Sequence, residues 1–181
     1  MKQVSYGIGH GRFQPPHIDH LKYLMSIAMR CDHLIIAITN PVQDTVKFVP
    51  ESDHRHSAEA NPYTYFERAE LIRFGLMDMG LDCRSYTIVP FDLFQPKTWR
   101  YFLPKSDCML YLRVFSDWEL RKKSIFEENG IPVKILDRPQ HKGMAATEVR
   151  VRIAKNQSIS DFVTPSVEKH LREIHGENNV V

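Results

Sequence analysis

A continuous apolar run rich in β-branched residues, His33 to Thr39, most constrains how this chain can fold. Such a run is typical of a strand that is covered on both faces of a parallel sheet. A second apolar run, Val4 to Ile8, comes earlier, and apolar residues at helical spacing lie between the two, from Ile18 to Met29. A strand, a helix and a strand in this order make a βαβ unit, whose strands are parallel and whose crossover is right-handed.

The same alternation continues along the rest of the chain. Thr64 and Glu67 fit a capping box, so a helix is predicted to begin after Thr64 and to stop near Gly80. Further strands are predicted at residues 86–89, 109–114 and 133–136, and further helices at 118–128, 147–155 and 165–174. The alternation predicts an α/β fold, a doubly wound, Rossmann-like parallel sheet with helices on both faces. Ligands of such sheets bind at the carboxyl ends of the strands, at a topological switch point.

Length and composition narrow the class of protein. The 181 residues suit a single domain, 1–181, with the C-terminal helices of 147–175 packed on it. Lys and Arg total 24 and Asp and Glu 22, a balance that argues against a nucleic-acid partner. No apolar run is long enough to span a membrane, and no secretory signal is recognisable. The cysteines, Cys31, Cys83 and Cys108, form no CxxC pair, so we expect a cytoplasmic protein without disulfides.

The segment GRFQPPHIDH, Gly11 to His20, follows the first strand and opens the first helix. His17 and His20 are three residues apart and share one helix face. A helix start exposes N–H groups that attract phosphate, and two imidazoles and Arg12 would add donors there. The same spacing also fits a turn-capping His17 and a half-exposed His20 on a surface helix. A metal pair is disfavoured, because no carboxylate or third histidine lies at ligand spacing.

A second group of candidate phosphate ligands lies in HKGMAATEVRVR, residues 141–152. Thr147 and Arg150 lie one turn apart at a predicted helix start. Residues 138–155 carry one acidic residue, Glu148, against five basic ones, Arg138, Lys142, Arg150, Arg152 and Lys155. A surface helix with solvated charges is the alternative. Taken with the first segment, this pattern favours polyphosphate chemistry, which needs placement and positive charge more than a nucleophile.

Residues 40–62 show neither helical nor strand periodicity. A structureless segment of this length is usually a functional loop or a disordered one. His54 and His56 within it fit a solvated polar loop better than a metal site.

Three segments together resemble a known family. GRFQPPHIDH resembles the GRFQPxHxGH signature of the HIGH-type nucleotidyltransferase superfamily, and MAATEVR resembles its ISSTEIR-type signature. NPYTYFER, residues 61–68, is similar to the N-P-[FY]-T-x-x-E-R helix start of the archaeal-type nicotinamide mononucleotide adenylyltransferases. Trp99 stands where that family has a tryptophan that stacks on the nicotinamide ring. The resemblance reaches to about residue 175.

The resemblance implies transfer of a nucleotidyl group from a nucleoside triphosphate to a phosphorylated acceptor with release of pyrophosphate. ATP and nicotinamide mononucleotide would give NAD. Mg²⁺ would arrive with the triphosphate, no protein metal ligand is implied, and a homo-oligomer is expected. The implied site comprises catalytic His17, His20 and Arg12, nucleotide-binding Gly11, Phe13, Thr147 and Arg150, and acceptor-binding Trp99.

Three departures from the family pattern bear on the substrates. Asp19 replaces the glycine of HxGH, and its carboxylate would repel phosphate or favour protonated histidines. LRVFSDWELRKK replaces an S/T-G-N-P stretch and is similar to a stretch of small cytidylyltransferases, so Asp117, Trp118 and Lys122 are candidate contacts for a nucleotide or an acceptor. Residues 42–60 form a longer loop than the family needs. Two alternatives stay open: a CTP-dependent cytidylyltransferase with a small phosphorylated acceptor, and a catalytically weak nucleotide-binding sensor.

Overall fold

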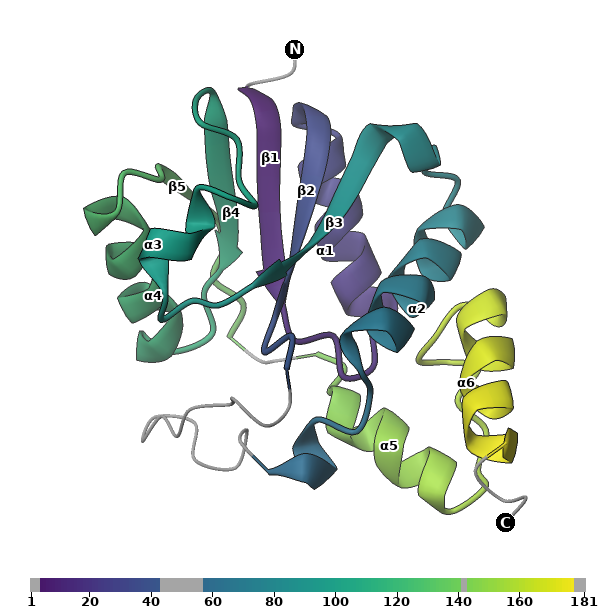
Figure 1. Ribbon diagram of the computed structural model, residues 1–181. Helices are drawn as coiled ribbons and strands as arrows, with labels where there is room; N and C mark the ends of the chain where they lie inside the picture. The colour runs from purple at the N-terminus through teal and green to yellow at the C-terminus, as the bar shows by residue number, and fades with distance from the viewer. Residues whose placement is uncertain (1–3, 43–56, 141–142, 178–181) are drawn as a thin grey trace.

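The computed structural model describes residues 4–42, 57–140 and 143–177. Within these ranges one five-stranded parallel sheet runs through the molecule in the order β3-β2-β1-β4-β5 (Figure 1). Its strands are β1 (Val4–Gly11), β2 (Cys31–Thr39), β3 (Tyr86–Phe91), β4 (Cys108–Arg113) and β5 (Val133–Asp137). The prediction of a doubly wound parallel sheet is confirmed. Strand order reverses at β1, because the chain moves outward through β2 and β3 on one side and through β4 and β5 on the other.

Helices cover both faces of the sheet. α1 (Ile18–Ala28) and α2 (Tyr65–Asp78) lie on one face, and α3 (Pro96–Trp99) and α4 (Asp117–Glu128) on the other (Figure 1). Two helices follow the sheet, α5 (Ala146–Ala154) and α6 (Pro165–Glu177). The predicted longer helices agree with these bounds within a few residues. α3 and the single turns η3 (Ala58–Ala60) and η4 (Cys83–Ser85) were not predicted, because they are too short to show a period.

The interior strand β2, which lies between β1 and β3, shows why its sequence is apolar throughout. Leu34, Ile36 and Ile38 pack against α1 and α2 in one buried cluster. Ile35 and Ala37 point the other way, into a second cluster that contains residues of α3 and α4. Alternate side chains of a strand face opposite sides of the sheet. A strand with helices on both faces therefore buries every side chain and is apolar along its length.

Helix α2 begins and ends as its sequence predicts. The N–H of Glu67 donates to Thr64 Oγ1 at 3.2 Å, and the N–H of Thr64 donates to Glu67 Oε2 at 2.7 Å. This reciprocal capping box satisfies two of the donors that a helix start leaves open. Gly80, with φ of 78°, follows the helix end, a backbone conformation that glycine adopts without strain.

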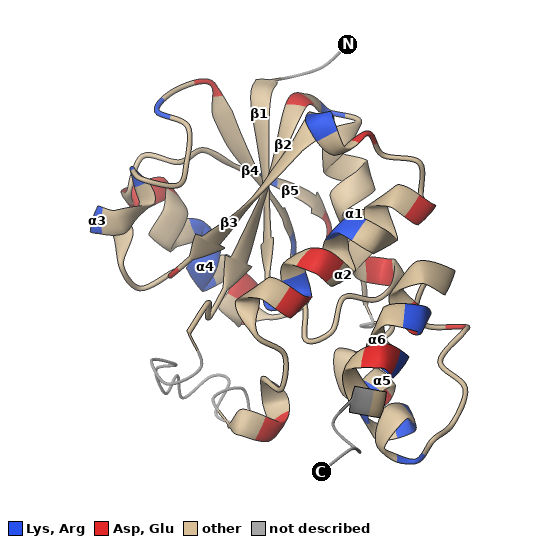
Figure 2. Cartoon of the chain, turned by 45° about the vertical axis from the view of Figure 1, so that its right-hand side comes forward, with Lys and Arg blue, Asp and Glu red and all other residues tan. Residues whose placement is uncertain are grey.

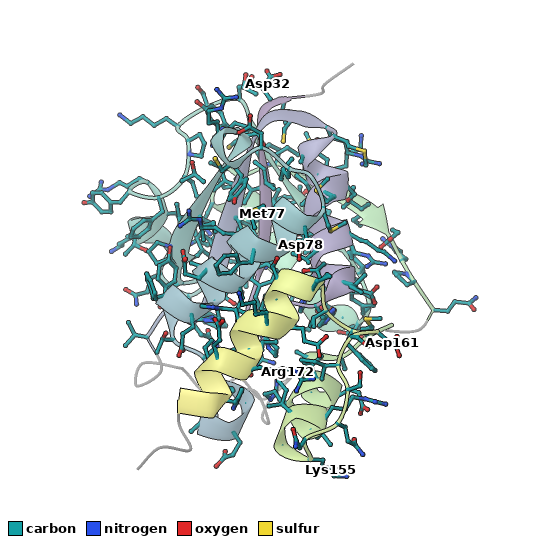
Figure 3. The ribbon with its side chains drawn as sticks, turned by 90° about the vertical axis from the view of Figure 1, so that its right-hand side faces the viewer. Asp32, Met77, Asp78, Lys155, Asp161 and Arg172 are labelled. Atoms are coloured by element: carbon teal, nitrogen blue, oxygen red, sulfur yellow. The ribbon has the colours of Figure 1, made fainter. Side chains whose placement is uncertain are left out.

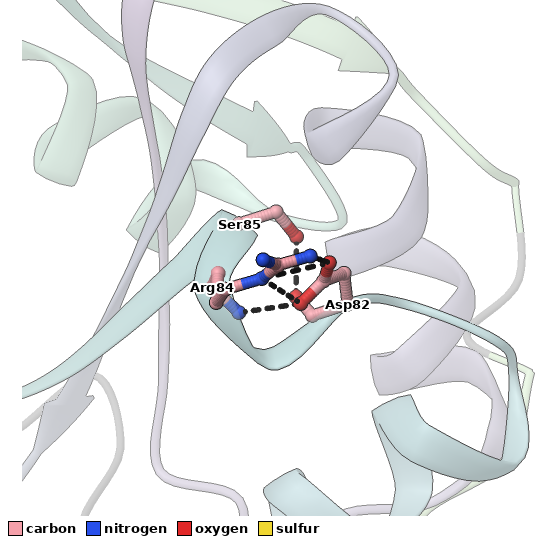
Figure 4. Close-up of polar contacts among 3 residues, drawn as sticks. All are labelled: Asp82, Arg84 and Ser85. Carbon is pink, nitrogen blue, oxygen red and sulfur yellow. Dashed lines mark hydrogen bonds and ion pairs between the residues drawn. The ribbon is translucent and has the colours of Figure 1, made fainter.

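The turn between α2 and β3 is held by local polar contacts (Figure 4). The Asp82 carboxylate accepts from the N–H of Arg84 at 2.9 Å and from its guanidinium at 2.8 Å, and Ser85 Oγ donates to the Asp82 carbonyl at 2.6 Å. These residues are exposed, so the ion pair contributes little to stability. Acidic and basic residues also lie close together on α2 (Figure 2).

The C-terminal helix packs on α2 through a third apolar cluster, which includes Leu71, Val149, Val167 and Leu171. A polar contact joins the same two helices: the N–H and Oγ of Ser166 donate to the Asp78 carboxylate at 2.8 and 2.6 Å (Asp78 is labelled in Figure 3). Cys31, Cys83 and Cys108 are free thiols. No helix in the described ranges is long and apolar enough to cross a membrane.

Candidate active site

A cavity of about 780 Å³ opens at the carboxyl ends of β1 and β4. His10 and Gly11 of β1, and Leu112 and Arg113 of β4, form part of its wall. This is the point where the strand order reverses, and the chain leaves β1 and β4 toward opposite faces of the sheet. The cavity therefore lies where doubly wound sheets bind their ligands.

The two signature segments meet in this cavity. Arg150 of α5 donates one hydrogen bond to the Gln14 carbonyl at 2.6 Å and another to Thr147 Oγ1 at 3.1 Å. The rings of His17 and His20 stack with their centroids 3.7 Å apart. All of these residues line the cavity. Folding thus brings the histidine pair and the Thr147–Arg150 pair to one place, although more than 120 positions separate them.

Two helix N-termini face the cavity without side-chain caps. His17 is the N-cap of α1 and Ala145 is the N-cap of α5, and neither side chain accepts a hydrogen bond from its helix. Both residues line the cavity. The positive ends of two helices, two imidazoles and one guanidinium make this part of the cavity suited to a polyphosphate.

Phe13 shapes the cavity behind the histidines. Its ring is 1% exposed and meets the ring of His20 edge-on, with centroids 5.1 Å apart. A Cβ on residue 11 would lie 3.0 Å from the Phe13 ring, so Gly11 makes room for this packing. Gly11 and Phe13 both line the cavity as predicted, and they also fix the position of His20.

The guanidinium of Arg12 reaches across the cavity toward η3. It donates to Asn61 Oδ1 at 3.3 Å and lies 3.5 Å from the Ala60 carbonyl. Arg12 and Ala60 line the cavity. The chain that follows the first strand is thereby joined to the chain that precedes α2.

Arg68 joins the same segments from inside. Its side chain is fully buried, and its guanidinium donates to the carbonyls of Arg12, Thr39 and Asn40 at 2.8 Å each. Burial lowers the pKa of Arg68 to about 10, so the group stays charged at neutral pH. Arg68 belongs to the NPYTYFER segment, but no local pattern indicates that its side chain holds the ends of β1 and β2.

The opposite wall of the cavity comes from α4 and the chain after β3. The rings of Phe94 and Trp118 lie 6.2 Å apart, and Lys122 Nζ lies 5.3 Å from the centre of the Trp118 ring. Lys122 also pairs with Glu119 at 3.5 Å. Among the described residues, this wall combines two aromatic rings with the Lys122 ammonium and the carboxylates of Asp92 and Glu119, in contrast to the side that carries the histidines.

Comparisons with known proteins agree with this geometry. No family model matches the chain. It is 32% identical to the phosphonoformate cytidylyltransferase of Streptomyces viridochromogenes, over 92% of this chain and 90% of that protein. It is 31% identical to the nicotinamide-nucleotide adenylyltransferase of Saccharolobus solfataricus, over 98% of this chain and 95% of that protein. The chain belongs to the family of archaeal-type nicotinamide-nucleotide adenylyltransferases. It is a nucleotidyltransferase.

Solved structures support the fold. A bifunctional NMN adenylyltransferase/ADP ribose pyrophosphatase from Francisella tularensis matches 88% of this chain with a TM-score of 0.66 and 20% identity. The nucleotidyltransferase described here spans 45% of that chain. The same bifunctional protein complexed with AMP and a manganese ion matches with a TM-score of 0.64.

The structure does not bring Trp99 to the cavity of this nucleotidyltransferase. Trp99 is 4% exposed and stacks on Phe126 at 4.8 Å in the cluster beneath α3 and α4. Its indole N–H donates to the Asp92 carbonyl at 2.8 Å, so its one polar group is satisfied inside. The prediction that Trp99 binds the acceptor is therefore corrected. Trp118 is the tryptophan that lines the cavity.

The three candidates from the segment LRVFSDWELRKK do not all reach the cavity. Trp118 and Lys122 line the cavity, whereas Asp117 does not and is exposed at the first position of α4. Residues Trp118 and Lys122 are four apart and share a helix face, and Asp117 precedes that face.

His10 is a cavity residue that the sequence analysis missed. It is 9% exposed, and its ring meets that of Phe126 edge-on at 5.3 Å. Burial, and secondarily the Lys122 ammonium, lowers its pKa to about 3, so the imidazole is neutral. Within the described residues its Nδ1 has no hydrogen-bond partner. The signal was present in the sequence as a polar residue ending an apolar strand.

The basic stretch 138–155 does not form one anion-binding surface. Arg150 lines the cavity, but Arg152 pairs with Glu148 at 2.7 Å and lies over the Phe162 ring. Lys155 lies at the far end of α5 (Figure 3). The alternative of a solvated surface helix is right for Arg152, and Lys142 lies outside the described residues.

The expected loop is described only at its ends. Pro41, Val42, Ser57 and Glu59 line the cavity. Residues 43–56, with His54 and His56, lie outside the described residues. In the described parts, no three His, Cys, Asp or Glu side chains are grouped so that they could hold a metal ion.

Proposed function

We propose that this nucleotidyltransferase moves the adenylyl group of ATP to nicotinamide mononucleotide, giving NAD and pyrophosphate. The observation that carries the proposal is the convergence of His17, His20, Thr147 and Arg150 on one cavity. The identity to the Saccharolobus solfataricus enzyme over nearly the full length of both chains supports the choice of substrates.

In this proposal the triphosphate lies across the N-termini of α1 and α5. His17 and His20 donate hydrogen bonds to the oxygens of the α-phosphate and the departing pyrophosphate, and Arg12 adds charge beside them. Thr147 and Arg150 hold the β- and γ-phosphates. Burial lowers the pKa of Arg150, which nevertheless remains a cation. Such donors act most strongly where charge builds in the transition state.

The step needs no covalent enzyme intermediate. A phosphate oxygen of the acceptor forms a bond to the α-phosphorus, and the bond from that phosphorus to the α,β-bridging oxygen breaks. The electron pair of that bond leaves with pyrophosphate. Charge on the triphosphate oxygens would be neutralised in part by Mg²⁺ bound with the nucleotide. The role of the protein is to align the two phosphates and stabilise the leaving group.

We assign the acceptor to the wall formed by His10, Trp118 and Lys122. Trp118 offers a partly exposed ring on which a planar base can stack. The neutral imidazole of His10 can donate or accept a hydrogen bond beside it. These residues take the place that the family resemblance gave to Trp99.

A CTP-dependent reaction is the second candidate. It is favoured by the 32% identity to a phosphonoformate cytidylyltransferase and by the presence of Trp118 and Lys122 in the cavity. The reaction at phosphorus is the same, and the base and the acceptor differ.

The deciding experiment supplies ATP, CTP, GTP and UTP in turn with Mg²⁺ and either nicotinamide mononucleotide or phosphonoformate. Pyrophosphate release and the product mass are measured. We expect NAD from ATP and the mononucleotide. CTP-dependent release with phosphonoformate alone would favour the second candidate, and no release above background would leave the sensor as the better description.

His20→Ala is the test of the site, and His33→Ala is its control. His33 lies on β2 away from the cavity and bonds Thr87 Oγ1. We expect turnover to fall in the first variant and to be unchanged in the second. The expected homo-oligomer is tested separately, by light scattering of the purified protein.

A further inference from the structure

Asp19, which departs from the HxGH pattern, does not point its carboxylate freely at the histidines. Its Oδ2 accepts a hydrogen bond from the backbone N–H of Met144 at 2.9 Å. Asp19 belongs to the first turn of α1, and Met144 lies two residues before α5. This bond therefore joins the starts of the two helices that face the cavity.

The absence of a side chain at Gly143 leaves room for this carboxylate. A Cβ on residue 143 would approach Asp19 Oδ2 more closely than real Cβ atoms do, and among the described residues its other near neighbour is Asp19 Cγ at 3.5 Å. The backbone of Gly143 is not left-handed, so glycine is not required there for conformational reasons. A side chain at residue 143 would therefore press against the Asp19 carboxylate.

The contact fixes the geometry of the phosphate-binding side. Asp19, Gly143, Met144 and the N-cap Ala145 all line the cavity. Thr147 and Arg150 follow within the next two turns. A shift of the chain at Met144 would move both of them relative to His17 and His20.

We propose that Asp19 and Gly143 form a matched pair that holds α5 against α1, and that Asp19 is a positioning residue for the nucleoside triphosphate. The idea rests on the proposed function, because it takes the cavity to bind a triphosphate. The carboxylate acts as a hydrogen-bond acceptor for the backbone. It stands at the glycine position of the HxGH signature, and its carboxylate favours glycine at a second position.

The test is a double-mutant cycle read by nucleotide binding. Asp19→Ala, Gly143→Ala and the double variant are titrated with ATP and with CTP by calorimetry, and the KM for the triphosphate is measured where turnover exists. Each single variant should weaken binding about 10-fold, the effect of slightly misplacing binding groups. The double variant should bind no worse than Asp19→Ala, because the added Cβ no longer meets a carboxylate.

Two further variants separate positioning from general stability. Asp19→Asn keeps an acceptor for Met144 and should recover most of the binding that Asp19→Ala loses. Asp78→Ala removes a similar carboxylate-to-backbone bond, from α2 to Ser166, away from the cavity. It should lower the unfolding temperature and leave nucleotide binding unchanged.

The possible results are distinct. An equal loss of nucleotide binding from Gly143→Ala in the wild-type and the Asp19→Ala background would overturn the pairing of Asp19 with Gly143. Unchanged binding in Asp19→Ala, or an equal loss in Asp78→Ala, would overturn the positioning role. Binding without turnover of any acceptor would overturn the proposed function alone, and no binding of ATP or CTP to the wild-type protein would overturn both.

Discussion

Replacing Arg68 with methionine should destabilise the protein far more than an ordinary surface change. Arg68 is fully buried, and its guanidinium makes three hydrogen bonds of 2.8 Å to the carbonyls of Arg12, Thr39 and Asn40. Hydrogen bonds to charged groups contribute about 1.5–3 kcal/mol each, but the cost of burying the cation offsets part of their sum. Because the carbonyls lie near the cavity and can partly rehydrate, we expect a loss of about 3–4 kcal/mol.

Urea unfolding followed by circular dichroism measures this free energy. For a chain of this size, 1 kcal/mol corresponds to roughly 2–4 °C in Tm, so a fall of about 6–16 °C should accompany it. Arg73→Met is the matched control, since Arg73 lies on the same helix with its side chain 59% exposed and pairs with Glu70 at the surface. It should change stability by about 0.5 kcal/mol or less. Equal effects of the two substitutions would refute the reasoning.

Three further results are expected. His20→Ala should lower turnover about 10²-fold, the usual cost of losing one transition-state donor. Steady-state kinetics on the soluble variant measure this, and an unchanged turnover number would contradict the assigned role. In the folded protein the pKa of His10 is about 3, below the ordinary value of 6.5. Between pH 6.5 and pH 3 the unfolded chain protonates this histidine and the folded protein does not. The free energy of unfolding therefore falls as the pH is lowered from 6.5. By pH 4.5 the loss is about 3 kcal/mol, and unfolding curves of His10→Phe should lack it. Trp99→Ala should cost about 3–5 kcal/mol of stability, whereas Trp118→Ala should raise the KM of one substrate with little change in stability; the reverse pattern would exchange their roles.

Much of the site could be predicted from the sequence because its parts are local. The GRFQPPHIDH segment carries its own strand end and helix start, and Thr147 and Arg150 sit one turn apart at another helix start. The sheet places the ends of all parallel strands at one edge, so segments that follow different strands meet there. Convergence of the two segments thus follows from the fold class, without knowledge of side-chain positions.

The position of Trp99 could not be predicted in this way. Both tryptophans follow strands and lie near helix starts, and the chain alone does not say which ring faces the cavity. Trp99 sits on the short α3, where Phe91 and Phe126 enclose it and the Asp92 carbonyl satisfies its N–H. Trp118 stands one helix later, where it is only partly buried against the same cluster and also lines the cavity.

The sequence itself determined the alternation of strands and helices, a parallel sheet with helices on both faces, and the two segments that meet at the cavity, because periodicity and capping act over a few residues. The tertiary structure alone decided that Arg68 holds three carbonyls, that His10 is buried beside Lys122, and that the Asp19 carboxylate meets the backbone at Met144. Each of these contacts joins residues at least 28 positions apart. Their partners are set by the directions of side chains between packed elements, which no local pattern encodes.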